Sequence, residues 1–166
     1  MQVRPAREDE LDDAGRLVAQ AYRDGDPTGT PDPYLEVVAD ARARSRDGEV
    51  LVAVDDDGTL LGSVTFALPP SPLAELGRDD EGEFRMLGVA ASAQSRGVGA
   101  ALVRACLDRS RAAGKAGVVL CTQEWMRSAQ RLYERQGFVR DPDRDWQPVP
   151  GVQLLAYRLR FDAAGS

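Results

Sequence analysis

The sequence predicts a single α/β domain over residues 1–166 that is built on a mixed β-sheet. Two observations indicate this fold class: a strand–turn–strand pattern in the middle of the chain, and a strand, a glycine-rich turn and a helix directly after it. The length of 166 residues and the 43% of hydrophobic residues fit one domain with its own core. The expected element order is β-α-α-β-β-β-α-β-α-β-β.

The first half of the chain predicts a strand, two helices and a hairpin. Apolar residues at helical spacing follow the first strand, and Pro33 suits the first turn of the second helix. The hairpin strands are separated by Asp-Asp-Asp-Gly at 55–58, and Asp-Gly between apolar runs is a strong turn signal. These elements are expected at 2–5, 8–22, 34–44, 50–54 and 60–68.

The second half predicts alternating strands and helices after an irregular connection at 69–82, and loops of this length are often functional. Gly88 lies inside the next strand and predicts a bulge or a close backbone approach. Gly114 and Gly137 end the two helices. Strands are expected at 83–89, 118–121, 138–140 and 153–161, and helices at 98–113 and 126–136, with Asp145 and Trp146 in a polar loop before the last strand.

Composition excludes several kinds of site and partner. The chain has no histidine and two cysteines, Cys106 and Cys121, so histidine-based triads and structural zinc tetrads are excluded and no metal is expected. Both cysteines are expected to be packing residues. The net charge of −6 argues against nucleic-acid binding and favours cationic small molecules or basic peptides, although such a charge can also simply keep a small domain soluble. Without an apolar leader or a bilayer-length apolar run, we expect no membrane association and a cytoplasmic location.

The glycine-rich turn at 94–99, Gln-Ser-Arg-Gly-Val-Gly, joins a strand to a helix. Backbone N–H groups at a helix start bind phosphate together with the helix dipole, and Gly97 and Gly99 let a phosphate approach the backbone. The turn lacks the Gly-Lys-Ser/Thr end of a P-loop, and it has Leu102 where the dinucleotide fingerprint needs glycine or alanine. A tight strand-to-helix turn without a ligand is the alternative.

Two motifs resemble signatures of the GNAT superfamily of acetyl-CoA-dependent N-acetyltransferases. The stretch Gln94-Ser95-Arg96-Gly97-Val98-Gly99 is similar to the family's Gln/Arg-x-x-Gly-x-Gly/Ala signature. The stretch 129–138, Ala-Gln-Arg-Leu-Tyr-Glu-Arg-Gln-Gly-Phe, resembles the second signature, in which Ala-x-x-Leu-Tyr is followed by Gly-Phe. The resemblance covers essentially the whole chain and implies the GNAT fold, a central mixed, mostly antiparallel sheet flanked by about four helices.

The resemblance implies acetyl-CoA as the acyl donor, without a metal. The strand that carries Gly88 is expected to bulge and to splay from its neighbour, which opens a V-shaped cleft for the donor. One departure is Met126, because many family members have an asparagine there that touches the cofactor. Strand backbone is expected to bind the pantetheine arm and the turn the pyrophosphate, so the implied cofactor-binding residues are Leu87, Val89, Gln94, Ser95, Arg96, Gly97, Val98, Gly99, Ala100 and Ala129.

Two residues are candidates for acid and base. Tyr133 matches the family tyrosine that protonates the CoA sulfur, whereas without the motif a core tyrosine is the simpler interpretation. Because histidine is absent, the base must be a carboxylate, directly or through water, unless the amine arrives neutral. Glu83 stands where some GNAT members have a catalytic glutamate. Period-2 alternation places Arg85 on the same face, where it could hold Glu83 ionised, and Leu87 and Val89 are expected there as well. The alternative is a solvated strand-end carboxylate paired with Arg85.

The implied reaction transfers the acetyl group to a primary amine in a ternary complex. Acceptor recognition in the family lies in variable loops, which here are 24–33, 69–82 and the loop of Trp146. Trp125 and Trp146 could wall a substrate pocket for a cationic amine, and ordinary packing under a loop is the alternative. A small cationic amine or a peptide is favoured by acidic loop residues, namely Glu75, Asp79, Asp80 and Glu81.

A function of another class stays open: a non-catalytic acetyl-CoA- or CoA-binding sensor or interaction module with the same fold. Tyr133 favours an enzyme, whereas Met126 and the absence of histidine favour the module. Transfer from a longer acyl-CoA depends on the space beside Leu87 and Val89. Edge strands near the C-terminus could support a homodimer.

Overall fold

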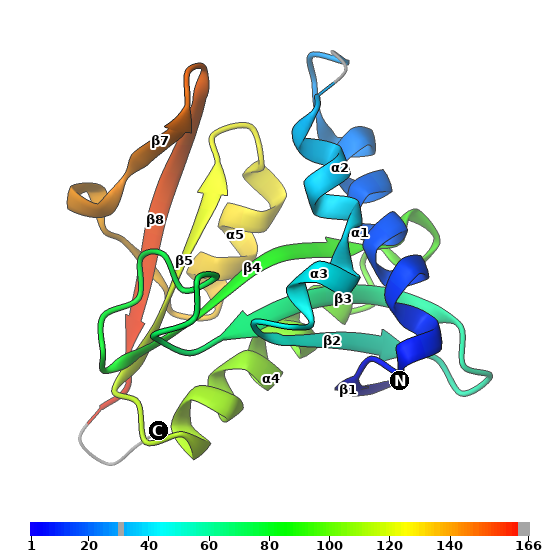
Figure 1. Ribbon diagram of the computed structural model, residues 1–166, viewed down its shortest axis with the longest axis horizontal. Coiled ribbons are helices and arrows are strands. Elements are labelled where there is room, and N and C mark those ends of the chain that lie inside the picture. Colours follow the sequence, from blue (N-terminus) through cyan, green and yellow to red (C-terminus); the bar gives the residue numbers. More distant parts are fainter. Residues whose placement is uncertain (30–31, 163–166) are drawn as a thin grey trace.

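The computed structural model describes residues 1–29 and 32–162. Within them, one twisted sheet of eight strands runs through the molecule, in the order β1-β2-β3-β4-β5-β8-β6 with β7 paired to β8 (Figure 1). All pairs are antiparallel except β4 with β5, which confirms the expected mixed, mostly antiparallel sheet. The strands are β1 (Gln2–Pro5), β2 (Glu49–Val54), β3 (Leu60–Ala67), β4 (Glu81–Val89), β5 (Gly117–Gln123), β6 (Val139–Arg140), β7 (Trp146–Val149) and β8 (Val152–Arg160).

The helices cover both faces of the sheet (Figure 1). The first three α-helices lie on one face, where α1 packs on β3 and β4, and the last two lie on the other, where α4 packs on β2 to β5. None of the helices in the described part of the chain combines the length and apolar character that a membrane span requires. The helices are α1 (Leu11–Gly25), α2 (Tyr34–Ala39), α3 (Ala41–Arg44), α4 (Val98–Ala112) and α5 (Arg127–Arg135), with short 3-10 turns at Glu8–Glu10, Ala91–Ala93 and Pro142–Arg144.

The segment expected as one helix over 34–44 is two helices that meet at Asp40. This residue leaves the helical region, with φ −89° and ψ 67°, and its carboxylate accepts a hydrogen bond of 3.0 Å from the Ala43 backbone N–H. Aspartate is a favoured N-cap because its side chain satisfies a free N–H of the first turn. Local capping therefore interrupts the helix.

Trp146, which was expected in a polar loop, begins strand β7. This strand forms a hairpin with β8, in which Trp146 pairs with Leu154 and the turn contains Gly151 at φ +85°. The strand is short and contains Pro148, a residue that usually argues against a strand. Pairing with the long β8 overrides this weak local preference.

The bulge expected in β4 is present, but it lies at Met86. Met86 has φ +56°, and the register with β3 shifts between Ser63 and Thr65. Gly88 instead permits a close approach of α1, because a Cβ there would lie 2.9 Å from the Cα of Val18. An inserted residue in one strand changes which face the following side chains occupy.

The bulge overturns the expectation that Glu83, Arg85, Leu87 and Val89 share one face. Leu87 and Val89 pack against the core that holds Phe84 and α4, although they are an odd number of residues from Phe84. Glu83 lies on the opposite face, where its carboxylate meets the backbone of the loop before β4. Simple alternation fails here because Met86 adds one residue to the strand.

Strands β4 and β5 are paired over three residues and then separate. The parallel register joins Glu81–Glu83 to Gly117–Val119, and Figure 1 shows β4 turning away from β5 beyond this point. The backbone of β4 after Glu83 therefore has no strand partner on that side within the described residues. The expected splay is confirmed, and it opens the sheet next to the glycine-rich turn.

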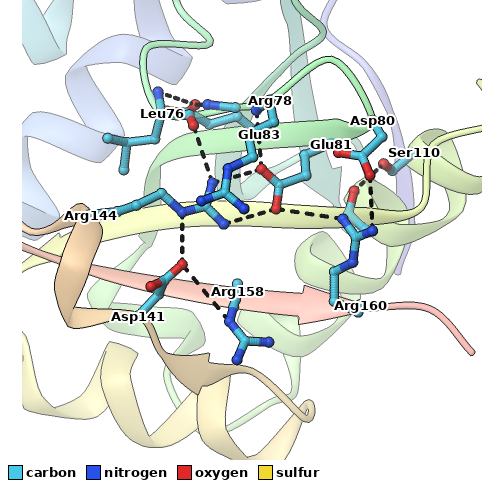
Figure 2. A network of polar contacts seen from close by, with 12 residues as sticks. Leu76, Arg78, Asp80, Glu81, Glu83, Ser110, Asp141, Arg144, Arg158 and Arg160 are labelled. Atoms are coloured by element: carbon cyan, nitrogen blue, oxygen red, sulfur yellow. Dashed lines mark hydrogen bonds and ion pairs between the residues drawn. The ribbon is translucent and has the colours of Figure 1, made fainter.

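A network of charged side chains ties the start of β4 to the C-terminal strands (Figure 2). Arg144 donates to both carboxylate oxygens of Glu81 at 2.7 and 2.9 Å, and also to Asp141 at 2.8 Å. Arg160 donates to Asp80 at 2.9 Å. Two of the loop carboxylates that favoured a cationic acceptor, Asp80 and Glu81, thus pair with arginines of this chain.

Candidate functional site

A cleft of about 690 Å³ lies where the splayed end of β4 meets the glycine-rich turn, α1 and α5. The glycine-rich turn forms one part of its lining, and apolar, aromatic and charged side chains form the rest. Its lining residues are Ala21, Tyr22, Asp24, Gly25, Leu87, Gly88, Val89, Ala91, Ala93, Gln94, Ser95, Gly97, Val98, Gly99, Ala100, Trp125, Met126, Arg127, Ser128, Ala129, Arg131, Leu132 and Arg135. Nine of the ten residues expected to bind the cofactor are in this set.

The backbone of the turn adopts left-handed conformations that only some residues accept. Ser95 has φ +64°, and Gly97, at φ +79°, is the N-cap of α4. Gly99 faces α5 closely, since a Cβ there would lie 2.9 Å from Leu132 Cδ2. The first N–H groups of a helix have no partner inside the helix. The turn therefore offers backbone N–H donors to a ligand in the cleft. Because Gly97 and Gly99 have no side chains, the space beside these donors stays open.

Two residues of the signature make contacts within the chain. The Gln94 amide donates a hydrogen bond of 3.1 Å to the Val89 carbonyl, so a ligand on that carbonyl must share or replace this bond. Arg96, the tenth expected residue, does not line the cleft and lies 3.4 Å from Asp55. Its side chain is 47% exposed, and an exposed pair of this kind is weak.

Three arginines of α5, Arg127, Arg131 and Arg135, line the cleft and form what we call the arginine stripe. They are exposed and spaced by four residues, which places them on one face of the helix. Phosphate groups are recognised by such arginines through charge-assisted hydrogen bonds. The sequence analysis missed them, although the i, i+4, i+8 spacing was a readable signal.

Trp125 and Trp146 are not brought together. Trp125 lines the cleft, lies edge-on to Tyr22 with ring centroids 6.4 Å apart, and donates to the Gln123 side chain at 2.8 Å. Trp146 does not line this cleft, and its indole N–H interacts with the thiol of Cys121. Of the two tryptophans, Trp125 therefore lines the cleft and Trp146 does not.

Met126 lies at the N-cap of α5 and lines the cleft. Its sulfur accepts a hydrogen bond of 3.4 Å from the Thr122 hydroxyl. A thioether is at most a weak hydrogen-bond acceptor, whereas an asparagine amide both donates and accepts. The contact made by asparagine in many relatives is not reproduced by this side chain.

Tyr133 lies beneath the cleft in an aromatic cluster. Its ring is 5% exposed and its centroid lies 5.7 Å from Phe84, 6.1 Å from Phe138 and 6.2 Å from Tyr157. Burial raises the pKa of its hydroxyl well above the usual range, so the group is protonated at neutral pH. The ring packs as the core interpretation expected, and Ala129 and Leu132 of the same helix line the cleft, whereas Tyr133 does not.

Glu83 is buried at the last residue of β4 that pairs with β5, with 2% of its surface exposed. Its Oε1 accepts hydrogen bonds from the backbone N–H groups of Leu76 and Gly77 at 2.9 and 2.8 Å. Glu83 does not form the expected ion pair with Arg85. Instead, Nη1 of Arg85 lies 3.6 Å from Oε1 of Glu75. Burial raises the pKa of Glu83 to about 7, despite the two backbone hydrogen bonds. It can therefore exchange a proton near neutral pH.

The two cysteines differ in their surroundings. Cys106 lies on α4 and is fully buried in the core, as expected of a packing residue. Cys121 is partly exposed and lines a second, smaller recess, and burial raises its pKa to about 11. Both thiols are therefore protonated at neutral pH. Among the described residues, no group of three or more acidic, cysteine or histidine side chains could hold a metal ion.

Comparisons with known proteins agree with this geometry. Residues 12–138 match the model of the acetyltransferase (GNAT) family. A mycothiol acetyltransferase of Beutenbergia cavernae is 37% identical over 103 residues, which are 57% of this chain and 32% of that protein, so the match spans about a third of the relative.

Solved structures show the same fold. A GNAT-family acetyltransferase of Staphylococcus aureus superposes with a TM-score of 0.73 at 13% identity, covering 96% of this chain and 98% of that one. A protein of Salmonella typhimurium solved with its cofactor acetyl-CoA gives a TM-score of 0.66 at 19% identity, covering 98% and 94%. Because the family model matches most of the chain, this protein belongs to the acetyltransferase (GNAT) family of acyltransferase enzymes.

Proposed function

We propose that this protein is an N-acetyltransferase that transfers the acetyl group of acetyl-CoA to a primary amine within a ternary complex. The observation that carries the proposal is the large cleft, in which the signature turn, the splayed end of β4 and the arginine stripe meet. The family match and the acetyl-CoA in the Salmonella typhimurium structure support the same donor.

The residues of the cleft fit a donor with several phosphate groups and an extended arm. The N–H groups after Gly97 would hold the pyrophosphate at the start of α4, where the helix dipole favours negative charge. The arginine stripe would pair with the remaining phosphate. The backbone of Leu87 and Val89, on the side of β4 that β5 leaves, would bind the amides of the pantetheine arm. Acetyl-CoA supplies the activated thioester.

Tyr133 would act as the acid and Glu83 as the base. A buried, protonated Tyr133 hydroxyl can donate its proton to the leaving thiolate sulfur once the donor is bound above it. Glu83, with a pKa of about 7, can accept the ammonium proton of the acceptor at its carboxylate through water. An alkylammonium of pKa about 10.4 must lose that proton before it can attack the thioester.

A calorimetric titration with acetyl-CoA tests the donor site, with NADH as the comparator. We expect micromolar acetyl-CoA binding and none of NADH, with at least about tenfold weaker acetyl-CoA binding after Gly99→Val, whose side chain would enter the cleft beside Leu132. Val139→Ala, at an exposed position far from the turn, is the control. Absence of acetyl-CoA binding at millimolar concentration would contradict the proposal.

Release of free CoA with a panel of primary amines then tests turnover. Donor binding without turnover of any amine would favour the second candidate, a CoA-binding sensor. The specific observation in its favour is that Tyr133 is buried and lies outside the set of cleft-lining residues.

A further inference from the structure

A small recess opens beside the donor cleft, between the separated strands β4 and β5. It measures about 30 Å³, roughly the volume of one or two water molecules. It shares Tyr22 and Met126 with the cleft, so a molecule in the cleft can extend a small group into it. The recess is lined by Tyr22, Tyr34, Arg85, Met86, Cys121, Thr122, Gln123, Met126 and Leu154.

Arg85 is the charged residue of this lining, and although its guanidinium interacts with the Tyr34 hydroxyl, not all of its N–H groups have an acceptor among the described residues. Its side chain is 15% exposed, and its buried Nε has no acceptor among the described residues. Its Nη1 makes two long contacts, 3.4 Å to the Leu73 carbonyl and 3.6 Å to Glu75, whose side chain is 40% exposed. A buried guanidinium N–H without a partner is costly, and a carboxylate is the usual group that satisfies it.

The thiol of Cys121, which also lines the recess, interacts with the charge of Arg85 and with the indole N–H of Trp146, a residue outside the recess lining. The lining donor without a partner among the described residues is therefore the Nε–H of Arg85. A group that only accepts hydrogen bonds, such as an ionised carboxylate, would satisfy it.

The surrounding charges also favour an anion. Arg44, 5% exposed, lies near Arg85 and donates to the neutral Thr65 hydroxyl and the Val37 carbonyl, so no carboxylate neutralises it directly. Glu83 is a buried carboxylate that interacts with Arg85, and burial raises its pKa to about 7. The carboxylates near the two arginines are therefore Glu83, with its raised pKa, the half-exposed Glu75, and the exposed Asp40 near Arg44.

We propose that the acceptor is an amine that also carries a carboxylate, and that this carboxylate binds Arg85 in the recess while the amine faces the donor cleft. The inference rests on the proposed acetyl transfer and narrows its acceptor to amino acids and related zwitterions. It replaces the preference for a purely cationic amine, because Asp80 and Glu81 of the acidic loop are neutralised by Arg160 and Arg144.

Matched acceptors test the carboxylate directly. The probes are leucine, phenylalanine and 4-aminobutanoate, each compared with the amine that lacks the carboxylate: 3-methylbutylamine, 2-phenylethylamine and propylamine. We expect at least one acid to exceed its matched amine in kcat/KM by about tenfold or more. Higher kcat/KM for the amine in every pair would overturn the proposal.

Variants assign the effect to Arg85. Arg85→Gln should lower the acid-to-amine ratio of kcat/KM by about tenfold, mainly through KM of the acid. Arg85→Lys should retain part of the ratio, because it keeps the charge and loses the planar fork. Arg104→Gln, an exposed position on α4, should leave the ratio unchanged. An equal loss for acid and amine in Arg85→Gln would overturn the assignment, and circular dichroism establishes that each variant is folded.

Binding separates this proposal from the acetyl-transfer proposal. If no acceptor releases CoA, the transfer proposal fails, and the recess is then tested by calorimetry with the same three acids and three amines in the presence of saturating CoA. A heat of binding that is observed with an acid, but not with its matched amine, would support the carboxylate site if it is also lost in Arg85→Gln. Absence of heat from all three acids would overturn it.

Discussion

Glu81 and Glu83 lie two residues apart on β4 and are equally buried, at 1% and 2% exposure. Their hydrogen-bond partners differ, because an arginine binds Glu81 and backbone N–H groups bind Glu83. Glu81 receives a bidentate bond from Arg144, and although burial opposes it, this pairing lowers the pKa of Glu81 (Figure 2). Glu83 receives two backbone N–H groups, and burial raises its pKa to about 7.

The difference shows that burial alone does not determine the state of a carboxylate. Backbone hydrogen bonds satisfy Oε1 of Glu83, but they carry no full charge to offset the loss of hydration. The guanidinium of Arg144 does so for Glu81, whose lowered pKa keeps it ionised at neutral pH. Glu83 can gain and lose a proton near pH 7, which is the property that a base in acetyl transfer requires.

The largest expected effect comes from breaking the Glu81 pair. Arg144→Ala removes the bidentate partner of the buried Glu81 carboxylate and leaves it the longer ion pair of 3.9 Å with Arg160, so it should lower the free energy of unfolding by about 3–5 kcal/mol, measured by urea denaturation. The control Arg104→Ala, at an exposed helix position, should change it by less than about 0.5 kcal/mol. A loss below about 1 kcal/mol for Arg144→Ala would show that Glu81 is neutralised in another way.

The next effect sharpens the role of Glu83. Glu83→Gln keeps an oxygen acceptor for Leu76 and Gly77 but cannot take a proton, so kcat at pH 7.5 should fall by about 100-fold. The measurement is steady-state CoA release with the best acceptor, and Glu36→Gln, an exposed position on α2, is the control. Wild-type turnover in Glu83→Gln would remove Glu83 from the mechanism.

The same variant tests the raised pKa through stability. Glu83 binds its proton more tightly in the folded state, so its contribution is fully present below pH about 4.5 and is lost as pH rises through about 7. Between pH 5 and pH 8 the wild type should therefore lose about 2 kcal/mol relative to Glu83→Gln, measured by urea denaturation at both pH values. An unchanged difference would mean that Glu83 titrates near its ordinary value.

The smallest expected effect concerns the tyrosine beneath the cleft. Tyr133→Phe keeps the ring contacts with Phe84 and Phe138 and removes the hydroxyl, so kcat should fall by at least about tenfold while the Kd of acetyl-CoA stays nearly constant. Single-turnover rates and calorimetry measure the two quantities separately. Turnover equal to wild type would leave Tyr133 with a packing role only.

The sequence by itself was enough for features that depend on neighbours along the chain. Asp-Gly between apolar runs predicted the β2–β3 hairpin, and the glycines at 97 and 99 predicted the turn that begins α4. The two signatures identified the family, and the model of that family matches residues 12–138. The spacing of the arginine stripe was also readable, because helix periodicity is local.

Tertiary structure alone decided the features that depend on remote partners. The bulge at Met86 appears only when β4 pairs with β3, and it reverses the face on which Leu87 and Val89 lie. Arg144, whose pairing lowers the pKa of Glu81, is 63 residues away from it along the chain. A pKa depends on every charge around a group and on the water that the group loses on burial. The sequence could therefore suggest Glu83 as a base, but it could not predict the pKa of Glu83. Only the folded structure determined that Glu83, and not Glu81, titrates near neutral pH.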